Sequence, residues 1–412
     1  MRQIFLILSQ KLKKSKQKDK ITYMVILAID TSCDDTCVAI LETRNKKLEI
    51  LSNVVSSQVK IHQKWGGVYP TLAKREHQRN LVPVSKKALE EANLLEQGEK
   101  KKIKIGKLKG IFKKEDYLLK ELENFLIKYG KPKIDLITVT IGPGLEPCLW
   151  VGVNFARALA YFYELSIIPI NHVEAHIFAN FIRENSQFLI PNFQFLVPAI
   201  CLVVSGGHTQ LILMKKFGKY KILGETRDDA AGECFDKVAR ILGLGYPGGP
   251  VIAAEAAKLK IKNLKLKIKL PRPMINQKNF DFSFSGLKTA VLYDFKSRPQ
   301  KVGESKEYIQ TIAAELQQAI VDVLINKTLR AAREFNTKSV ILGGGVVANN
   351  ELRRQFREKI KKELPHTKYL IPDIKFCTDN AVMVGITAYS HYLRGERRDW
   401  KRIMVDANLT LK

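Results

Sequence analysis

The chain has 412 residues, of which 45% are apolar, enough for two domains with separate hydrophobic cores. Its net charge of +28, from 69 Lys and Arg against 41 Asp and Glu, favours a polyanionic partner such as RNA. No apolar run reaches the ~20 residues that span a bilayer, and the six cysteines include no CxxC pair. The composition therefore argues against an integral membrane protein and a disulfide-stabilised scaffold, and predicts a cytoplasmic protein with reduced thiols.

Two lysine-rich segments are expected to lie outside the conserved body of the fold. Residues 1–23 precede the first strong strand and are expected to be a disordered basic extension or, because Met24 stands directly before that strand, a start-site artefact. Residues 93–133 contain an amphipathic stretch at 115–128 and predict an insertion or a helical connection. This insertion is either a surface RNA contact or a solvated extension.

The remainder alternates apolar runs with helical patterns, which is typical of a layered α/β architecture. The predicted strands are 25–30, 135–142, 199–205, 209–215 and 339–345. The predicted helices are 150–163, 171–183, 230–242, 308–335, 350–362 and 379–393.

Two strand-turn-strand units have similar patterns, one at 25–41 and one at 199–215. Each places small or polar residues at its turn. Their similarity indicates an internal duplication, and a pair of such turns is what a nucleotide cleft between two related domains requires.

Two histidines, His172 and His176, lie four residues apart in NHVEAH. On a helix they share one face and can reach the same cation, with a third ligand from elsewhere in the chain. Two polar residues on a half-buried helix remain the alternative. Glu174 points away from that face at about 100° per residue, which argues against the HExxH arrangement of zinc proteases, in which glutamate is the general base.

Two turns carry the residue types that phosphates and cations require. Ser205, Gly206 and Gly207 are small enough for backbone N–H groups to approach phosphate oxygens, although an ordinary hairpin turn would look the same. The turn DTSCDDT at 30–36 contributes the carboxylates Asp30, Asp34 and Asp35, which are candidates for positioning a cation, a water or a protonated amine near the phosphates.

Three further polar residues follow apolar strands or begin helices. Asn349, at the end of GGGVVAN, is a candidate reader of a base or ribose, and Asp236 lies close to the glycine loop GYPGGP at 245–250. Asp379, in FCTDNA, precedes a predicted helix, where it is either an N-cap or the missing third metal ligand.

Taken together, the motifs resemble those of the bacterial tRNA N6-adenosine threonylcarbamoyltransferase family. The resemblance runs from about residue 25 to the C-terminus, interrupted mainly by 93–133. It implies the two-domain α/β fold shared by actin, heat-shock chaperones and sugar kinases (the ASKHA fold), with duplicated RNase H-like subdomains. The expected domains are 24–165 with about 380–412, and 166–379. The supporting motifs are DTSCDDT, GGVYPTLAKREH, IGPGL, NHVEAH, VVSGGHTQL, DDAAGECFDK, GYPGGP, FDFSFSGLKTAV, GGGVVANNELR and CTDNAVM.

The resemblance also implies site residues and a reaction, in which threonylcarbamoyl-AMP donates its threonylcarbamoyl group to N6 of adenosine 37 in tRNAs that read ANN codons, releasing AMP. The implied ligands of one divalent metal, Fe²⁺ or else Zn²⁺, are His172, His176 and Asp379. Asp34 or Asp35 is the candidate catalytic base. The implied substrate contacts are Val203, Val204, Ser205, Gly206, Gly207, Asp236, Gly249 and Asn349.

Two other functions remain open from the sequence. An ATPase or small-molecule kinase of the same fold would share the phosphate turns but has no reason to keep NHVEAH together with Asp379. A non-catalytic scaffold subunit would be expected to lack these ligands. The resemblance further implies a related dimerising subunit and a small ATPase as partners, besides tRNA, and no membrane.

Overall fold

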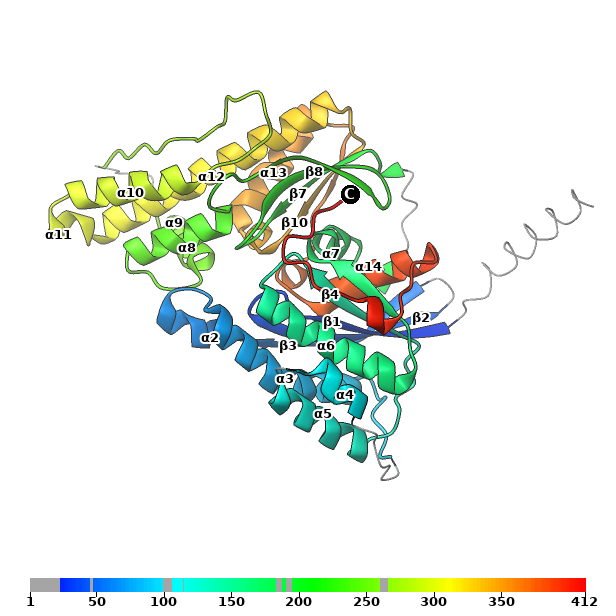
Figure 1. Ribbon diagram of the computed structural model, residues 1–412. Coiled ribbons are helices and arrows are strands. Elements are labelled where there is room, and N and C mark those ends of the chain that lie inside the picture. Colours follow the sequence, from blue (N-terminus) through cyan, green and yellow to red (C-terminus); the bar gives the residue numbers. More distant parts are fainter. Residues whose placement is uncertain are drawn as a thin grey trace, which may run out of the picture.

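The computed structural model describes residues 23–44, 47–98, 106–113, 115–182, 187–189, 195–259 and 266–412. The extension expected at 1–23 lies outside these residues except for Tyr23, which begins the first strand. The described residues form two mixed sheets (Figure 1), with strand orders β5-β4-β1-β2-β3-β6 and β11-β10-β7-β8-β9. The strands are β1 (Tyr23–Asp30), β2 (Asp35–Arg44), β3 (Lys47–Ser57), β4 (Leu136–Gly142), β5 (Ile167–Asn171), β6 (Gln187–Leu189), β7 (Ala199–Val204), β8 (Thr209–Lys216), β9 (Lys219–Glu225), β10 (Ser339–Gly343) and β11 (Lys368–Leu370).

The two sheets repeat one topology. In the first, β1 and β2 are antiparallel, β2 and β3 are antiparallel, and β4 and β5 continue parallel to β1. In the second, β7, β8, β9, β10 and β11 pair in the same order and with the same directions. The expected duplication and the two-domain ASKHA fold with RNase H-like subdomains are therefore confirmed.

The boundary between the domains follows from sheet membership. β5 pairs in parallel with β4 in the first sheet, although the expected division at 165/166 assigned residues 167–171 to the second domain. β6 also pairs with β3 of the first sheet, so the first strand of the second sheet is β7, which begins at Ala199.

Helices cover the sheets in the positions that the apolar patterns predict. The helix expected at 115–128 within the insertion is α5, which follows a short α4. A long helix that the sequence analysis did not predict, α3, contains Pro83 in its interior. The helices are α2 (Val59–His62), α3 (Pro70–Glu91), α4 (Gly106–Ile111), α5 (Asp116–Lys128), α6 (Glu146–Tyr163), α7 (His172–Phe178), α8 (Ala231–Ile241), α9 (Gly248–Ala257), α10 (Ser285–Ser297), α11 (Gln300–Gly303), α12 (Lys306–Glu334), α13 (Asn350–Glu363) and α14 (Ala381–Leu393).

Strand alternation divides the interior into three apolar cores. On β1, Val25 and Leu27 face a core shared with α3, α5 and α6, whereas Ile26 and Ala28 face α7 and α14. Successive strand side chains point to opposite faces, so a strand buried on both faces serves two cores. The first sheet therefore lies between an outer helical layer and an inner one.

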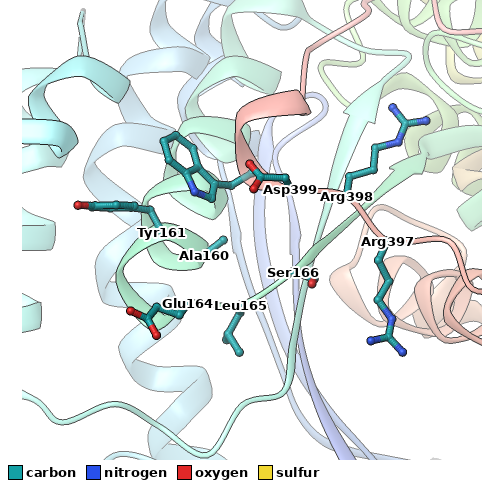
Figure 2. A pocket seen from close by; sticks show the side chains of 9 residues that line it. Ala160, Tyr161, Glu164, Leu165, Ser166, Arg397, Arg398 and Asp399 are labelled. Carbon is teal, nitrogen blue, oxygen red and sulfur yellow. The ribbon is translucent and has the colours of Figure 1, made fainter.

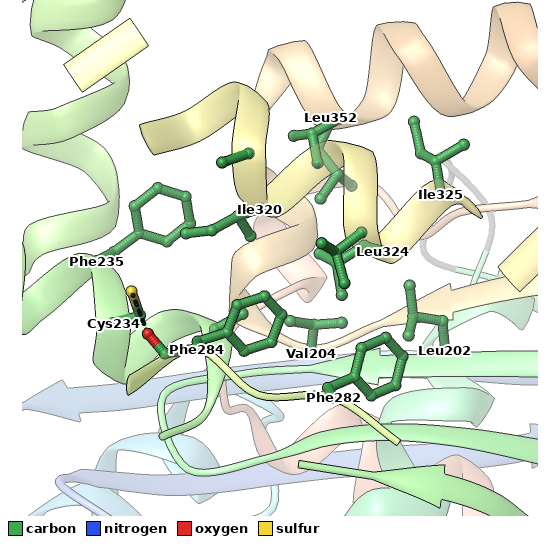
Figure 3. Close-up of a cluster of buried hydrophobic side chains, with 14 of the residues drawn as sticks. Leu202, Val204, Cys234, Phe235, Phe282, Phe284, Ile320, Leu324, Ile325 and Leu352 are labelled. Atoms are coloured by element: carbon green, nitrogen blue, oxygen red, sulfur yellow. Dashed lines mark hydrogen bonds between the residues drawn. The ribbon is translucent and has the colours of Figure 1, made fainter. Parts of the chain in front are cut away.

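The second sheet is covered in the same way. Leu202 on β7 packs against α8, α12 and α13, in a core that includes the stacked rings of Phe282 and Phe284 (Figure 3). Cys201 and Val203, on the opposite face, join the core of α7 and α14. Both sheets thus share one central helical layer, seen between them in Figure 1.

The C-terminal segment connects the two domains. The N–H of Asp406 donates to Ile141 O and the N–H of Gly144 to Ala407 O, so the segment runs beside the end of β4. Farther on, the N–H of Tyr220, on β9 of the second sheet, donates to Lys412 O. The same segment is therefore bound to both domains.

A surface pocket of about 520 Å³ lies between the end of α6 and the segment that precedes the C-terminus (Figure 2). It contains none of the site residues expected from the sequence. The pocket is lined by Ala160, Tyr161, Glu164, Leu165, Ser166, Arg397, Arg398, Asp399 and Trp400.

No helix among the described residues is long and apolar enough to cross a membrane.

Replacing Phe282 by alanine should destabilise the second domain. Phe282 is buried against the apolar faces of β7 and α12, so its loss leaves a cavity that costs about 3–5 kcal/mol. Phe195→Ala, at an exposed ring, should change the free energy of unfolding by less than about 0.5 kcal/mol. Urea unfolding followed by circular dichroism measures both, and equal losses would contradict the packing described.

Candidate metal and phosphate site

The helix that carries both histidines begins at the end of a strand. Asn171 ends β5 and caps α7, its side-chain oxygen accepting hydrogen bonds from the N–H groups of Val173 and Glu174 at 2.8 and 3.2 Å. The cap fixes where the first turn starts and hence which residues face inward. The rings of His172 and His176 lie 4.6 Å apart, centroid to centroid, on one face of the helix.

Asp379 completes the cluster from the beginning of α14. Its Oδ1 lies 3.4 Å from His172 Nε2 and 3.3 Å from His176 Nε2, and one possible ligand atom from each residue falls within 4.8 Å of the others. Asp379 is not the N-cap of α14, because Asn380 accepts the hydrogen bond from Met383 N–H at 3.1 Å. The N-cap alternative considered for Asp379 is therefore wrong.

The cluster has donor atoms that fit a divalent cation. Among the described residues, no partner with good hydrogen-bond geometry is found for either ring nitrogen of the buried His176, although Nε2 lies 3.3 Å from Asp379 Oδ1. An imidazole buried without such a partner is costly, and a metal ion would satisfy it. Two imidazoles and one carboxylate are ligands that both iron and zinc accept.

Asp30 contacts the ring nitrogen of His172 that does not face Asp379. Its Oδ2 lies 3.2 Å from His172 Nδ1, and Ser32 Oγ lies at the same distance. Nδ1 is therefore engaged, which leaves Nε2 directed at Asp379. A carboxylate behind a histidine commonly fixes the orientation of a metal ligand in this way.

The charged groups of the cluster shift one another's pKa values. Burial disfavours the charged form of His172, but Asp379 and Asp30 outweigh it and raise its pKa to about 10. Burial lowers the pKa of His176. Burial also opposes ionisation of Asp379, but the two histidines hold its pKa well below the usual range. A proton on His172 thus compensates charge that a bound cation would compensate instead.

Glu174 faces away from the cluster, as its position on the helix predicts. Tyr220 donates its hydroxyl to Glu174 Oε1 at 2.8 Å, and His391 Nε2 lies 2.9 Å from Oε2. The carboxylate is therefore committed to α14 and β9. It connects the helix of the two histidines to both neighbouring elements.

The turn that follows β7 lies beside the metal-ligand cluster. Val203 and Val204 end the buried strand, the N–H of Ser205 donates to His208 O at 2.8 Å, and the N–H of His208 donates to Ser205 Oγ at 3.1 Å. The rings of His208 and His172 lie 6.4 Å apart. His208 belongs to the motif VVSGGHTQL, but the sequence analysis gave it no role at the site. Its closeness to His172 could not be predicted, because only the fold brings the end of β7 to α7.

Glycines keep the turn open on one side and tightly packed on the other. A side chain added at Gly206 or Gly207 would meet no atom within 4 Å. By contrast, a Cβ at Gly232, in the first turn of α8, would lie 2.6 Å from Ser205 O. The N-terminus of α8 therefore packs directly against the turn, and N–H groups at a helix N-terminus favour anions.

Asp236 and Gly249 lie on adjoining helices of the second domain. Asp236 Oδ1 accepts a hydrogen bond from Gly248 N–H at 2.6 Å, which joins α8 to the start of α9. Burial raises the pKa of Asp236 to about 6. The space beside Gly249 is open within 4 Å.

Asn349 has both side-chain groups engaged. Its oxygen accepts from Leu352 N–H at 3.0 Å as the N-cap of α13, and its Nδ2 donates to Gln317 Oε1 at 2.7 Å. The role of Asn349 in reading a base stays a prediction.

Asp35 begins β2 on the face directed at the metal-ligand cluster. It alternates with Cys37 and Ala39, which belong to the central core, and Cys37 Sγ lies 3.6 Å from Asp379 O. Burial raises the pKa of Asp35 to about 7, with Asp379 and Asp34 adding to the increase. Asp34 lies in the preceding turn, and burial raises its pKa as well.

The chain is similar to the sequences of one known family. A sequence profile of the tRNA N6-adenosine threonylcarbamoyltransferase family matches residues 49–103 and 118–386. The unmatched residues 104–117 fall inside the expected insertion at 93–133.

Proteins named tRNA N6-adenosine threonylcarbamoyltransferase align with most of the chain. The relative from Persephonella marina is 44% identical over 372 residues, covering 90% of each chain. The relative from Thermosipho africanus is 42% identical, covering 91% of this chain and 97% of its own. That from Thermodesulfovibrio yellowstonii is 45% identical with the same coverage, 91% and 97%.

Metal binding should depend on the three clustered side chains. His176→Ala or Asp379→Ala should weaken Zn²⁺ binding, measured by calorimetry on chelator-treated protein, by more than about 100-fold, and Asp30→Asn should weaken it by about 10–100-fold. His366→Ala, at an exposed histidine, is the matched control and should bind as the wild type does. Unchanged affinity in the first two variants would disprove the metal assignment.

Proposed function

The chain belongs to the tRNA N6-adenosine threonylcarbamoyltransferase family, and we propose that it transfers the threonylcarbamoyl group of threonylcarbamoyl-AMP to N6 of adenosine 37 in tRNAs that read ANN codons. AMP is the second product. One observation supports this most strongly: the His172–His176–Asp379 cluster lies beside the open glycine turn at Ser205. A cation site and a phosphate site at one place are what an acyl adenylate requires.

The metal of this proposal is one divalent ion per chain, Fe²⁺ or Zn²⁺, held by His172, His176 and Asp379. When bound, the ion supplies a Lewis acid for the carbonyl or carboxylate of the donor. Asp30 keeps His172 oriented, and Glu174 anchors α7 through Tyr220 and His391.

The adenylate would be held by the second domain. A side chain added at Gly206 or Gly207 would meet no atom within 4 Å, so a phosphate has room to approach the turn that follows Ser205, and the N-terminus of α8 adds a favourable field. The remaining proposed contacts flank this turn or lie on the neighbouring helices. They are Val203, Val204, Asp236, Gly249 and Asn349.

Asp35 is the better placed of the two candidate bases. As N6 of adenosine attacks the carbonyl carbon, a new N–C bond forms, the C–O bond to the phosphate of AMP breaks, and N6 loses a proton. A carboxylate with a pKa of about 7 is matched to accept that proton near neutral pH. Asp34, in the adjacent turn, is the alternative.

The two other functions are not favoured. A kinase or ATPase would use the phosphate turn but not the His172–His176–Asp379 cluster, and a scaffold subunit needs neither. The relatives that share 42–45% of their residues with this chain are all named as the transferase. We further propose a related dimerising subunit and a small ATPase as partners in the reaction.

Transfer should be measurable directly. Wild-type protein incubated with threonylcarbamoyl-AMP and an ANN-decoding tRNA transcript should produce the modified nucleoside, scored by mass analysis, with proposed partners added in a second series. His176→Ala should lower the rate by about 100-fold or more, because a metal contributes several kcal/mol and each 1.36 kcal/mol is tenfold. ATP hydrolysis or phosphorylation of a small molecule, without nucleoside modification, would favour the kinase alternative instead.

The transfer rate should rise with pH as Asp35 loses its proton. The carboxylate is the active form, so the rate falls below its pKa, with a midpoint at or below pH 7 because a nearby cation lowers that pKa. Asp35→Asn should remove this limb of the pH–rate profile and lower the rate by about 10²–10⁴-fold. If only Asp34→Asn has this effect, Asp34 is the base.

A further inference from the structure

An exposed pair of aromatic rings lies outside the residues considered so far. Trp65 is 65% exposed and Tyr69 is 56% exposed, and their rings stack with centroids 5.9 Å apart and planes 26° apart. We call these two residues the aromatic platform. Two large rings side by side in water expose apolar surface that a partner could cover.

The loop beneath the platform is well ordered. Trp65 ends a short 3₁₀ helix that Gly66 terminates with a left-handed backbone, and Tyr69 directly precedes α3. The buried His62 accepts a hydrogen bond from Tyr69 N–H at 3.3 Å through Nδ1, while its Nε2 lies 3.0 Å from Gln58 Oε1. The rings are thus presented by a fixed backbone, which lowers the entropy lost on binding.

The platform lies next to the proposed site. The N–H of Gln58 donates to Asp34 O at 3.2 Å, which ties the start of this loop to the turn of the candidate bases. From the other domain, the Arg240 guanidinium donates to Gly66 O, and Arg240 lies one helical turn after Asp236 on α8. The loop therefore contacts elements that carry proposed site residues from both domains.

Positively charged residues flank the rings in the sequence. Residues 60–75 contain Lys60, Lys64, Lys74 and Arg75 and no Asp or Glu. Lys60, Lys64 and Arg75 are exposed, and no ion pair joins them to a carboxylate within the described part of the chain. Lys74 lies 3.9 Å from Glu115. The neighbourhood is therefore cationic as well as aromatic.

We propose that the aromatic platform stacks unpaired bases of the tRNA anticodon loop and so presents the neighbouring adenosine to the site. This inference rests on the proposed function for the identity of the RNA. Exposed rings on which bases stack, together with lysines and arginines that follow the phosphates, are the recurring means of holding single-stranded nucleic acid. Exposed cations beside exposed rings suit a polyanion with stacking bases, which is why we favour RNA over a protein partner.

The test is direct binding of a fluorescent anticodon stem-loop from an ANN-decoding tRNA, followed by anisotropy with the full chain. Trp65→Ala and Tyr69→Ala should each weaken binding by about tenfold, the order of magnitude of one lost base–aromatic stack. Trp65→Phe should stay within about threefold, because it keeps a ring. Tyr293→Ala removes an equally exposed ring on α10 and should bind as the wild type does.

A second series identifies the stack itself. Stem-loops with an abasic residue at one loop position at a time keep the phosphate but lose the base. At the stacked position the abasic change should weaken binding to the wild type by about tenfold and leave binding to Trp65→Ala unchanged, because the two changes remove the same contact. Penalties that are the same for both proteins at every position would overturn the proposal.

The outcomes separate the platform from the reaction. Wild type that binds RNA through these rings but modifies no tRNA, even with partner proteins, would disprove the proposed function and leave the platform standing. If the wild type modifies tRNA, and both alanine variants keep the wild-type RNA affinity and KM for tRNA, the proposed function would stand and the platform would be disproved. Loss of affinity for a protein partner alone, with RNA binding intact, would assign the surface to that partner and overturn the proposal.

Discussion

The two sheets bury α7 and α14 between them, and this shared apolar layer sets the position of each proposed metal ligand. Strand alternation gives β1 and β7 one face each toward the layer, so both domains pack against the same two helices. α7 brings its two histidines to the layer's edge, and the residue just before α14 brings Asp379. The geometry of the cluster is therefore a property of how the domains pack together, not of either domain alone.

Charge compensation is the second constraint on the site. Two carboxylates, Asp30 and Asp379, lie on opposite sides of His172 and raise the pKa of that ring. Once His172 loses its proton, the negative charge of these two carboxylates is what a divalent ion would balance. Asp35 lies close enough for Asp379 to raise its pKa, so the occupancy of the cluster and the strength of the proposed base are coupled.

The sequence predicted the elements whose patterns are local and missed what depends on partners distant in the chain. Most buried strands and the helices α6, α8, α12, α13 and α14 follow from apolar periodicity, and so does the direction of Glu174. The sequence alone could not decide whether Asp379 is a helix cap or a metal ligand. Asn380 is an equally good cap, and only the fold brings α14 beside α7. The α3 helix was missed because Pro83 normally interrupts a helix. The pairing of His172 with Asp30 joins residues far apart in sequence and has no local signal.

The C-terminal segment limits how the two domains can move. Asn171 Nδ2 donates to Leu409 O at 3.2 Å, in addition to the main-chain bonds that join the segment to the end of β4 and to β9. A motion that pulled the domains apart along this side would have to break all of these bonds together. On the side of α2 and α8 (Figure 1), Arg240 and Gly66 supply a single hydrogen bond across the domains. The apolar layer of α7 and α14 is also buried against both sheets, so the C-terminal segment adds hydrogen bonds to a contact that already resists separation of the domains.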